Sequence, residues 1–373
     1  MKNILYIMHV PWGIIKQRPH FFAEELSSIY HLDVLHRCQH FNKSHLVTKE
    51  ESSKGNISFY QYDILPFDKI PVVRKLVPDF INRFIIKKRM PKGKKYDIVW
   101  ITSPYTYWYF KDIIPQGIPL FYDCMDDMSE FPELSLARKE LVLKAEKLLL
   151  GRTTHVIFSA DHLKDKIKER YGFNGSSSVV NNAIEMPSKD FNYTPSQDVK
   201  EKIDFIQSLS SPIIYIGAIA PWFDFESVTK VLNSNKTVNL VLIGPKSVEI
   251  PDNPRIHAIG TVPRDAIFTF MQLATALIMP FKITELIKSV NPVKLYEYIY
   301  SGKPVIASRY TETEKFLPYV SLYSNSEELG KLIENSLSDN YPVFTKEERE
   351  AFLSNNTWSS RMTKIDEVLA QYI

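Results

Sequence analysis

The sequence predicts two doubly wound α/β domains, and two observations lead to this fold class. First, the chain has 373 residues, and at about 100 to 200 residues per domain this length predicts two hydrophobic cores. Second, short apolar runs alternate with helical segments in both halves, which is typical of parallel βαβ units. A composition of 44% hydrophobic and 24% charged residues agrees with two globular domains.

The first half carries apolar runs of strand length at residues 4–10, 32–35, 57–62, 97–102, 119–123 and 155–159. Helices are predicted there at residues 18–30 and 134–150. The second half repeats the scheme, with strands predicted at residues 212–217, 239–244, 256–259, 276–280 and 304–307. Its predicted helices cover residues 225–234, 264–273 and 293–300.

The least structured stretch lies at residues 182–196, which contain two prolines and several Ser and Asn residues, so we place the linker there. The predicted first domain spans residues 1–185 and the second spans residues 196–355. Residues 356–373 are predicted to form a C-terminal helix that packs back on the first domain. Because ligands of open parallel sheets bind at the carboxyl ends of the strands, we expect the functional residues in the loops after strands.

Composition excludes several classes of protein. Cys38 and Cys124 make neither a disulfide framework nor a zinc-binding spacing, which fits a reducing cytoplasm. The first residues are those of a strand and its loop and not of a signal peptide, and no run approaches the length of a spanning helix. The net charge of +3 is too small to indicate nucleic acid as a partner. We therefore expect a cytoplasmic protein.

One stretch, residues 69–95, is strongly basic and carries a single acid, Asp79. Its cations are Lys69, Arg74, Lys75, Arg83, Lys87, Lys88, Arg89, Lys92, Lys94 and Lys95. Apolar residues recur at helical spacing through the same stretch, which predicts a basic amphipathic helix. Such a helix binds the anionic inner face of a cell membrane, which would make the protein peripheral there. A solvated basic face on a helix packed into its own domain is the alternative.

One helix start in the second half is unusually well specified. Asn291 is a favoured N-cap residue, and Pro292 is a favoured first helical residue. The free N–H groups of the first turn, beginning at Val293, favour an anion. Lys294 adds a positive charge in that turn, and Glu297 lies on the same face one turn deeper. Because a carboxylate accepts hydrogen bonds from vicinal ribose hydroxyls, the pattern is that of a phosphate and ribose site.

The same spacing also fits a plain structural element. A capped helix with a surface ion pair between Lys294 and Glu297 occurs in many α/β proteins. Local spacing alone does not separate this alternative from a nucleotide site.

A longer segment distinguishes the two explanations. Residues 291–308 (NPVKLYEYIYSGKPVIAS) resemble the nucleotide-binding segment of GT-B glycosyltransferases, in which a Pro-x-Lys-x-x-Glu-Tyr helix precedes Gly-Lys-Pro-Val. Other segments resemble the same family in the same order: Gly217 with residues 222–224, 242–245, 259–263 and 279–281. The resemblance implies a GT-B fold, in which two Rossmann-like doubly wound domains face each other across a cleft. It also implies a nucleotide-sugar donor, with a UDP-sugar expected.

The resemblance gives roles to individual residues of the second half. It implies that Gly217 lets the backbone approach the donor diphosphate, that Lys294 pairs with this diphosphate, and that Glu297 binds the ribose. The residues expected to bind the donor nucleotide are Gly217, Thr261, Val262, Lys282, Asn291, Pro292, Val293, Lys294 and Glu297. Thr261 and Val262 would hold the base. Lys282 would contact phosphate or the donor sugar, although a solvated loop lysine is an equal alternative.

The first half resembles bacterial cell-surface polysaccharide glycosyltransferases, such as the teichuronic acid enzymes and, more distantly, xanthan glucuronosyltransferase. Residues 17–20 (QRPH) and 122–127 (YDCMDD) carry this resemblance. An inverting transferase needs a base for the acceptor hydroxyl, and a carboxylate after a strand is placed to act as one. Asp126 is our first candidate and Asp127 the second. A helix cap or a turn residue is the structural alternative for these acids.

Three residues near the first helix, His20, Trp12 and Gly13, are expected to contact the acceptor or the donor sugar. A structural role is the alternative for a lone His near a helix start. The close carboxylates of residues 122–127 would also suit a divalent cation on a diphosphate. Because the helix start and Lys294 already neutralise the diphosphate, we predict neither an obligatory metal nor another cofactor.

The predicted function is transfer of a sugar from a nucleotide diphosphate to a hydroxyl of a glycan or lipid-linked saccharide. A sugar-nucleotide epimerase of the same two-domain shape is the alternative enzyme. A non-catalytic scaffold or glycan-binding subunit is the alternative outside enzymes. A nicotinamide dehydrogenase is disfavoured, since no predicted strand is followed by G-x-G-x-x-G.

Overall fold

The computed structural model describes the chain except residues 14, 39–55, 65–78, 188–192, 339–340 and 342–343. It divides the chain into two compact units. Unit 1 comprises Met1–Asn181 together with Trp358–Ile373, and unit 2 comprises Asn182–Thr357. The predicted linker at residues 182–196 therefore belongs to unit 2, and the boundary lies immediately before it.

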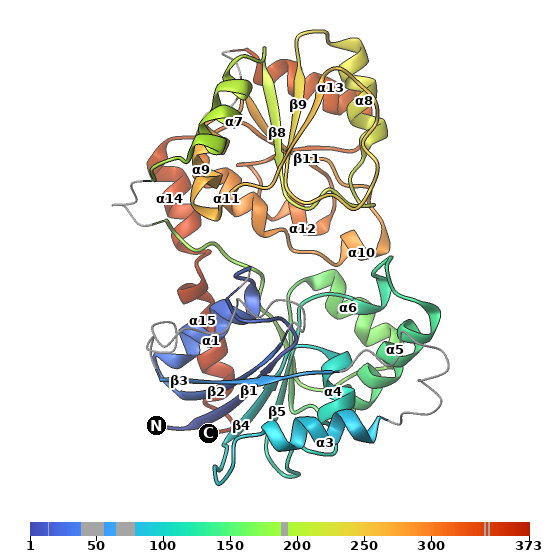
Figure 1. The fold of residues 1–373 in the computed structure, drawn as a ribbon, viewed down its shortest axis with the longest axis vertical. Coiled ribbons are helices and arrows are strands. Elements are labelled where there is room, and N and C mark those ends of the chain that lie inside the picture. Colours follow the sequence, from blue (N-terminus) through green and yellow to red (C-terminus); the bar gives the residue numbers. More distant parts are fainter. Residues whose placement is uncertain (14, 39–55, 65–78, 188–192, 339–340, 342–343) are drawn as a thin grey trace. The chain divides into compact units, whose positions relative to one another are not determined.

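Unit 1 is built on a seven-stranded parallel sheet (Figure 1). In spatial order its strands are β3 (Ile57–Tyr62), β2 (His31–Arg37), β1 (Asn3–Met8), β4 (Ile98–Ile101), β5 (Leu120–Cys124), β6 (His155–Phe158) and β7 (Ser177–Val179). Its helices are α1 (Arg18–Ser27), α3 (Phe80–Arg89), α4 (Pro104–Phe110), η3 (Met128–Glu130), α5 (Leu136–Leu150), α6 (Asp161–Tyr171) and α15 (Trp358–Leu369). The apolar strands of the sequence fit this sheet, because β1, β4 and β5 are buried throughout their centres.

Unit 2 is built on a six-stranded parallel sheet. In spatial order its strands are β10 (Ile256–Gly260), β9 (Asn239–Ile243), β8 (Pro212–Ile216), β11 (Ala276–Met279), β12 (Val305–Ser308) and β13 (Ser321–Tyr323). The longer helices are α7 (Gln197–Gln207), α8 (Phe225–Ser234), α9 (Ile267–Leu273), α11 (Val293–Ser301), α13 (Ser326–Ser336) and α14 (Lys346–Ser354). The short ones are η4 (Arg264–Ala266), α10 (Glu285–Lys288) and α12 (Thr311–Glu314).

Apart from the additional strand β7 in unit 1, both sheets have the same strand order, and this order determines where each unit can bind a ligand. The chain runs outward from the central strand in one direction, returns, and continues in the other. The reversal occurs between β1 and β4 in unit 1 and between β8 and β11 in unit 2. At such a reversal the loops after the two strands diverge and leave a crevice at the carboxyl ends. The predicted fold class of two doubly wound α/β domains is confirmed.

The C-terminal helix α15 is part of unit 1. Its first residue, Trp358, stacks on Phe21 of α1 with ring centroids 4.6 Å apart and meets Phe22 edge-on. Where the chain crosses between units, the N–H of Ile184 donates to the carbonyl of Asn356 over 2.9 Å. The two crossing segments are thus hydrogen-bonded to each other within unit 2.

Several predicted boundaries differ from the structure. The helix predicted at residues 264–273 is divided into η4 and α9. In the basic stretch, the structure describes residues 79–95, where α3 covers the last part of the predicted helix, and the earlier cations lie outside the described residues. The short edge strands β7 and β13 were not predicted, because three-residue strands carry too little apolar pattern.

Candidate functional site

The start of α11 lies one residue later than predicted. Pro292 is the N-cap and Val293 the first helical residue, so the assignment of Asn291 as N-cap and Pro292 as first helical residue is wrong. A proline N-cap has no side-chain acceptor, and the structure places no side-chain cap on this helix. The first-turn amides at Val293 and Lys294 are therefore not used by a capping side chain, which leaves them for another acceptor.

Asn291 has tertiary partners that explain why it is not a cap. Its Oδ1 accepts the N–H of Asn182 over 3.0 Å, and its Nδ2 donates to Oε2 of Glu312 over 2.9 Å. The carbonyl of Asn291 also accepts Nδ2 of Asn182 over 2.7 Å. Asn291 and Glu312 are buried. These bonds fix the chain as it enters α11.

Lys294 and Glu297 lie on the partly open face of α11, as predicted from their spacing. Lys294 Nζ donates to Glu297 Oε2 over 2.6 Å, so the surface pair of the structural alternative is also present. Their side chains are 32% and 19% exposed. A pair this accessible contributes about 0 to 1 kcal/mol. The bond between Lys294 and Glu297 can therefore be replaced by bonds from each side chain to a ligand, at a small cost in free energy.

The loop after β8 lies next to α11. The hydroxyl of Tyr298, in the second turn of α11, accepts the N–H of Ile216, the last residue of β8, over 2.8 Å. Gly217 follows directly, and neighbouring atoms leave no room for a side chain at this position. A Cβ on Gly217 would lie 2.7 Å from the Tyr215 hydroxyl, and a Cβ on Gly244 would lie 2.0 Å from the Gly217 carbonyl. The lack of side chains at these two positions lets the ends of β8 and β9 approach each other, where the N–H of Gly217 donates to the carbonyl of Ile243 over 2.9 Å.

The loops after β8 and β11 are joined by backbone hydrogen bonds. The N–H of Lys282 donates to the carbonyl of Trp222, and the N–H of Asp224 donates to that of Pro280, both over 2.8 Å. Asp224 also caps α8 by accepting the N–H of Ser227. Lys282 thus projects from a fixed backbone, and its side chain is exposed.

The predicted base-binding residues follow the edge strand β10. Thr261 is exposed, and Val262 is partly buried against the core of unit 2. The carbonyl of Thr261 accepts Lys202 Nζ from α7 over 3.4 Å. The structure therefore gathers Gly217, Lys282 and the α11 residues around β8, β11 and α11, whereas Thr261 and Val262 lie farther along the same sheet edge.

In unit 1, three aspartates lie at the end of β5, and their environments differ. Asp123 is fully buried; its Oδ1 accepts a hydrogen bond from Arg18 Nε over 2.9 Å and forms an ion pair with Nη2 at the same distance. Arg18 also donates Nη1 to the carbonyl of Val180 over 2.7 Å. Arg18 and Asp123 therefore form a buried ion pair that fixes α1 to strand β5 of the sheet.

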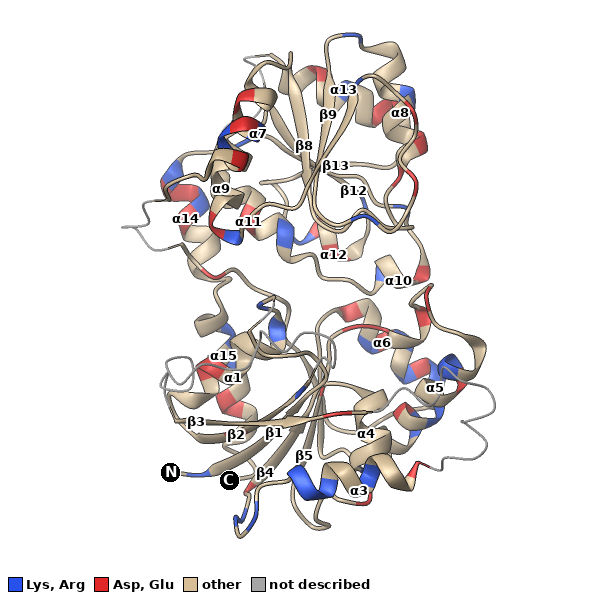
Figure 2. Ribbon diagram, viewed as in Figure 1, with Lys and Arg blue, Asp and Glu red and all other residues tan. Residues whose placement is uncertain are grey.

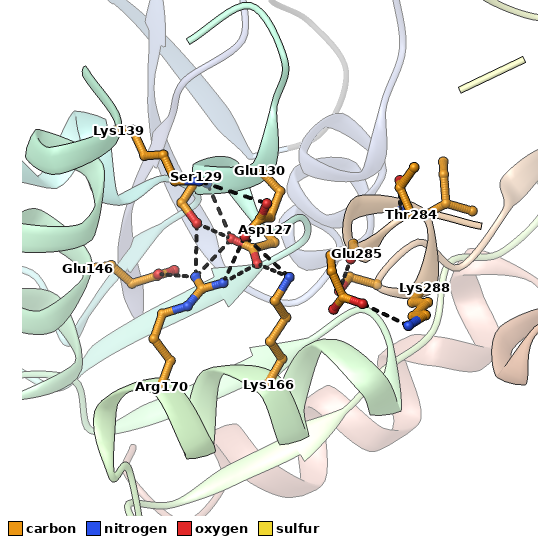
Figure 3. A network of polar contacts seen from close by, with 12 residues as sticks. Asp127, Ser129, Glu130, Lys139, Glu146, Lys166, Arg170, Thr284, Glu285 and Lys288 are labelled. Atoms are coloured by element: carbon orange, nitrogen blue, oxygen red, sulfur yellow. Dashed lines mark hydrogen bonds and ion pairs between the residues drawn. The ribbon is translucent and has the colours of Figure 1, made fainter. Parts of the chain in front are cut away.

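Asp127 is also fully buried and fully engaged (Figure 3). It accepts Arg170 Nη1 at 2.9 Å and Nη2 at 2.5 Å, and Lys166 Nζ lies 3.0 Å from its Oδ2. The Ser129 hydroxyl donates to it over 2.7 Å. Although burial acts to raise the pKa of Asp127, the hydrogen bonds from Arg170 and Ser129 lower it to about 2. A carboxylate held this way is a poor base.

Asp126 lies between these engaged residues and is different. Among the described residues, nothing donates a hydrogen bond to its carboxylate, which is partly buried. Burial raises the pKa of Asp126 to about 7; Arg18 acts to lower it, and Asp123 and Asp127 act to raise it. A carboxyl group with a pKa near neutrality, placed after a strand, suits proton transfer at physiological pH.

Trp12 and Gly13 lie in the loop between β1 and α1, and His20 lies in the first turn of α1. Nδ1 of His20 accepts the N–H of Gln17 over 3.1 Å, and its Nε2 lies 3.0 Å from the carbonyl of Pro11. His20 is buried, and its ring lies 5.0 Å from that of Trp12. Gly13 is exposed with a φ of +84°. His20 therefore shapes this loop, which favours its structural alternative.

His9 is a further candidate for a functional residue, and it was not predicted from the sequence. It follows β1 directly, at the strand-order reversal, and its Nδ1 lies 2.8 Å from the hydroxyl of Thr102, which follows β4. Burial lowers the pKa of His9 to about 4, so the imidazole is neutral at pH 7. The predicted first strand extended two residues too far and placed His9 inside it. A strand ending at Met8 would have identified His9.

Two further properties bear on the predicted partners. Within the described residues, no group of three or more His, Cys, Asp or Glu side chains is arranged to hold a metal ion. No helix in that part of the chain has both the length and the apolar character needed to cross a membrane.

Comparison with known proteins gives relatives in sequence and in fold. No protein-family model matches the chain. A protein of Bacillus subtilis named as a teichuronic acid biosynthesis glycosyltransferase, TuaH, is 23% identical over 266 residues. The match covers 66% of this chain and 65% of TuaH.

Two solved structures cover the chain almost completely. Sucrose-phosphate synthase from Thermosynechococcus elongatus matches with a TM-score of 0.73 at 14% identity over 99% of both chains. HepE from Anabaena, solved in complex with UDP and glucose, matches with a TM-score of 0.67 at 14% identity over 100% of both chains. The chain therefore has the two-domain GT-B fold and is similar in sequence to a protein named as a teichuronic acid glycosyltransferase.

Proposed function

We propose that this protein is a glycosyltransferase that takes a sugar from a nucleotide diphosphate, with UDP as the expected nucleotide. The observation that carries the proposal is the start of α11. Its first-turn amides have no side-chain cap, and Lys294 and Glu297 lie beside them on a partly open face. The helix is hydrogen-bonded to the end of β8, at the reversal of strand order where this class of sheet binds ligands.

The donor would bind along this edge of unit 2. The amides of α11 and the Lys294 ammonium offer hydrogen bonds and positive charge to the diphosphate. Glu297, one turn deeper, accepts hydrogen bonds from the ribose hydroxyls. Gly217 and Lys282 line the adjoining loops, and Thr261 and Val262 lie where the base would extend. Asn291, Pro292 and Val293 hold the helix start in place.

The choice of UDP is supported by relatives. HepE, which shares the fold, has been solved with UDP, with UDP and glucose, and with UDP-glucose. No metal is part of the proposal, because Lys294 and the helix dipole oppose the charge that develops on the departing diphosphate.

The acceptor hydroxyl would be activated in unit 1. If configuration inverts, Asp126 takes the acceptor proton as the oxygen bonds to the anomeric carbon, and the bond to the diphosphate breaks. Asp126 is favoured over Asp127, because its carboxylate has no hydrogen-bond donor among the described residues and its pKa is raised to about 7. If configuration is retained, Asp126 has no such role, and the donor site is unaffected.

The acceptor would be a glycan or lipid-linked saccharide, which agrees with the role in teichuronic acid biosynthesis that the name of TuaH gives to that protein. The residues of α3 support a membrane location for this acceptor, and Figure 2 shows basic residues at one end of the helix. Phe80 and Phe84 lie one turn apart and are 62% and 57% exposed, and the last turn carries Lys87, Lys88 and Arg89. Exposed aromatic rings beside cations suit an anionic lipid surface.

The membrane part has its own test. Replacing both Phe80 and Phe84 by Ser should lower the fraction of protein that sediments with vesicles containing phosphatidylglycerol, while uncharged vesicles bind neither protein. Equal sedimentation of the two proteins would exclude α3 as the membrane contact.

The function is tested by incubating the protein with a panel of nucleotide sugars and measuring nucleotide release, with and without lipid-linked saccharide. Slow UDP release from one donor, accelerated by acceptor, is expected. No release from any donor would favour a scaffold. Interconversion of two sugar nucleotides without release would favour an epimerase.

A further inference from the structure

The loop after β5 is anchored on both sides of Asp126. On one side, the carbonyl of Met125 accepts the Ser159 hydroxyl over 2.7 Å. On the other, the Asp127 carboxylate is held by Arg170 and by Ser129. Asp126 is therefore the middle residue of a short turn whose two neighbours cannot move freely.

Arg170 is the centre of the second anchor (Figure 3). Its two terminal nitrogens donate hydrogen bonds to the two carboxylate oxygens of Asp127, and Nη1 also donates to the Ser129 hydroxyl over 3.0 Å. Ser129 in turn donates to Asp127, which closes a ring of hydrogen bonds. Such a bidentate guanidinium–carboxylate pair fixes direction as well as distance.

Arg170 is itself held from behind by α5. Its Nη1 lies 3.9 Å from the buried carboxylate of Glu146. Glu146 accepts the hydroxyls of Tyr122 over 2.9 Å and Tyr171 over 3.0 Å, so its own position is fixed by β5 and α6. The arrangement is a chain of contacts from Glu146 through Arg170 and Asp127 to the turn that carries Asp126.

We propose that Arg170, backed by Glu146, is a positioning residue that sets the direction and the ionisation of the Asp126 carboxylate. The inference rests on the proposed function, in which Asp126 is the base. Arg170 acts through Asp127 and not by touching substrate. The charged groups that act on Asp126 are Arg18 of α1, Asp123 of β5 and Asp127. The charged groups linked to Asp127 by ion pairs, directly or through Arg170 or Glu130, are Glu130 of η3, Lys139 and Glu146 of α5, and Lys166 and Arg170 of α6.

The effect of removing Arg170 has a definite sign. Asp127 keeps Lys166 at 3.0 Å as a counterion and stays ionised. The surroundings of Asp126 then lose a positive charge and keep a negative one, which disfavours its ionised form. The pKa of Asp126 should therefore rise in Arg170→Gln, and Arg170→Lys should restore part of the original value.

The test compares Arg170→Gln and Arg170→Lys with a control, Lys164→Gln, which removes a positive charge from α6 without contact with Asp127. Protein labelled with ¹³C at the aspartate carboxyl carbons is titrated by NMR, and Asp126→Asn identifies the Asp126 resonance. We expect the Asp126 midpoint to rise by at least half a pH unit in Arg170→Gln and to be unchanged in Lys164→Gln. An unchanged midpoint in folded Arg170→Gln would overturn the proposal.

Activity gives an independent readout. With the donor identified by the nucleotide-sugar panel, the rise of kcat/KM with pH should move upward in Arg170→Gln by the same amount, while the Kd for UDP stays unchanged. A loss of activity that is equal at every pH would mean a purely structural role. The NMR result does not need catalysis, so a failure of the proposed base, seen as full activity in Asp126→Asn, remains distinguishable from a failure of Arg170 positioning.

Discussion

Apart from strand β7, the two sheets of this protein share one strand order but build their carboxyl-end loops in different ways. In unit 2, backbone hydrogen bonds join the loops after β8 and β11, and the charged candidates Lys282 and Lys294 remain accessible. In unit 1, the equivalent edge is held by buried ion pairs, Arg18 with Asp123 and Arg170 with Asp127. The proposed site for an anionic ligand thus lies on loops joined by uncharged backbone hydrogen bonds, and the proposed base lies on a loop held by ion pairs.

The ion pairs of unit 1 explain why the adjacent carboxylates of Asp126 and Asp127 have different pKa values. Asp127 is part of one of these ion pairs, and its pKa is lowered to about 2 by hydrogen bonds from Arg170 and Ser129. Asp126 lies between the two ion pairs and takes part in neither, and burial raises its pKa to about 7. Engaging the neighbours in ion pairs leaves one carboxylate available for chemistry.

The largest expected effect is on catalysis by Asp126→Asn. General base catalysis contributes about 10²- to 10⁴-fold, so kcat/KM should fall by that factor while UDP still binds. In the native protein kcat/KM should rise through about pH 7, as Asp126 loses its proton, and then level off. Asp165→Asn on the exposed side of α6 serves as the control. Full activity of Asp126→Asn would remove Asp126 from the mechanism.

The next largest effect is on stability, and it should separate Asp127 from Asp126. Asp127→Asn removes the buried carboxylate that lies closest to Arg170 and Lys166 and leaves them only the more distant Glu130 and Glu146. Breaking a buried pair costs about 3 to 5 kcal/mol. Urea unfolding at pH 7 should show this loss, whereas Asp126→Asn should be neutral or stabilising. If the two substitutions have equal effects on stability, the contrast between the carboxylates is wrong.

Acid should reveal the same contrast. The pKa of Asp127 is lower in the folded protein than its ordinary value of 3.8, so its contribution to stability is present above that value and is lost as pH falls through about 2. Asp126 has a raised pKa, so the native protein loses stability as pH rises from about 4 to about 7. Substituting Asp126 by Asn should flatten that part of the pH profile.

A smaller effect is expected on donor binding in unit 2. Lys294→Ala and Glu297→Ala should each weaken UDP binding by about 10- to 100-fold, since a hydrogen bond to a charged group contributes about 1.5 to 3 kcal/mol. Isothermal titration calorimetry measures the change. The matched control is the exposed pair of Glu285 and Lys288, also three residues apart and joined over 2.7 Å, whose alanine variants should bind UDP normally.

The smallest expected effect is on stability and UDP binding when the loop after β8 in unit 2 is altered. In Gly217→Ala the new methyl group would lie 2.7 Å from the Tyr215 hydroxyl, which donates to the carbonyl of Ala218. Displacing that hydroxyl should cost about 1 kcal/mol of stability, and UDP binding should weaken a few-fold. Unchanged thermal unfolding would mean that Tyr215 moves aside freely.

The sequence predicted the strands that form both sheet centres, because β1, β4, β8 and β11 are buried apolar runs. It placed Lys294 and Glu297 correctly on one face, since helical spacing is local. It failed at Asn291, where partners 109 and 21 residues away compete with the capping role. Likewise, the engagement of Asp127 depends on Arg170, 43 residues away. Spacing along the chain does not reveal such tertiary pairings.

The proposed donor site is tested most directly by a crystal structure of the protein with UDP. We expect the diphosphate at the first turn of α11, within hydrogen-bond distance of Lys294 Nζ, and the ribose hydroxyls on the carboxylate of Glu297. Lys294 and Glu297 would then have exchanged their mutual bond for the ligand. A nucleotide bound elsewhere, with the Lys294–Glu297 pair intact, would contradict the proposed donor site and leave α11 as a surface helix.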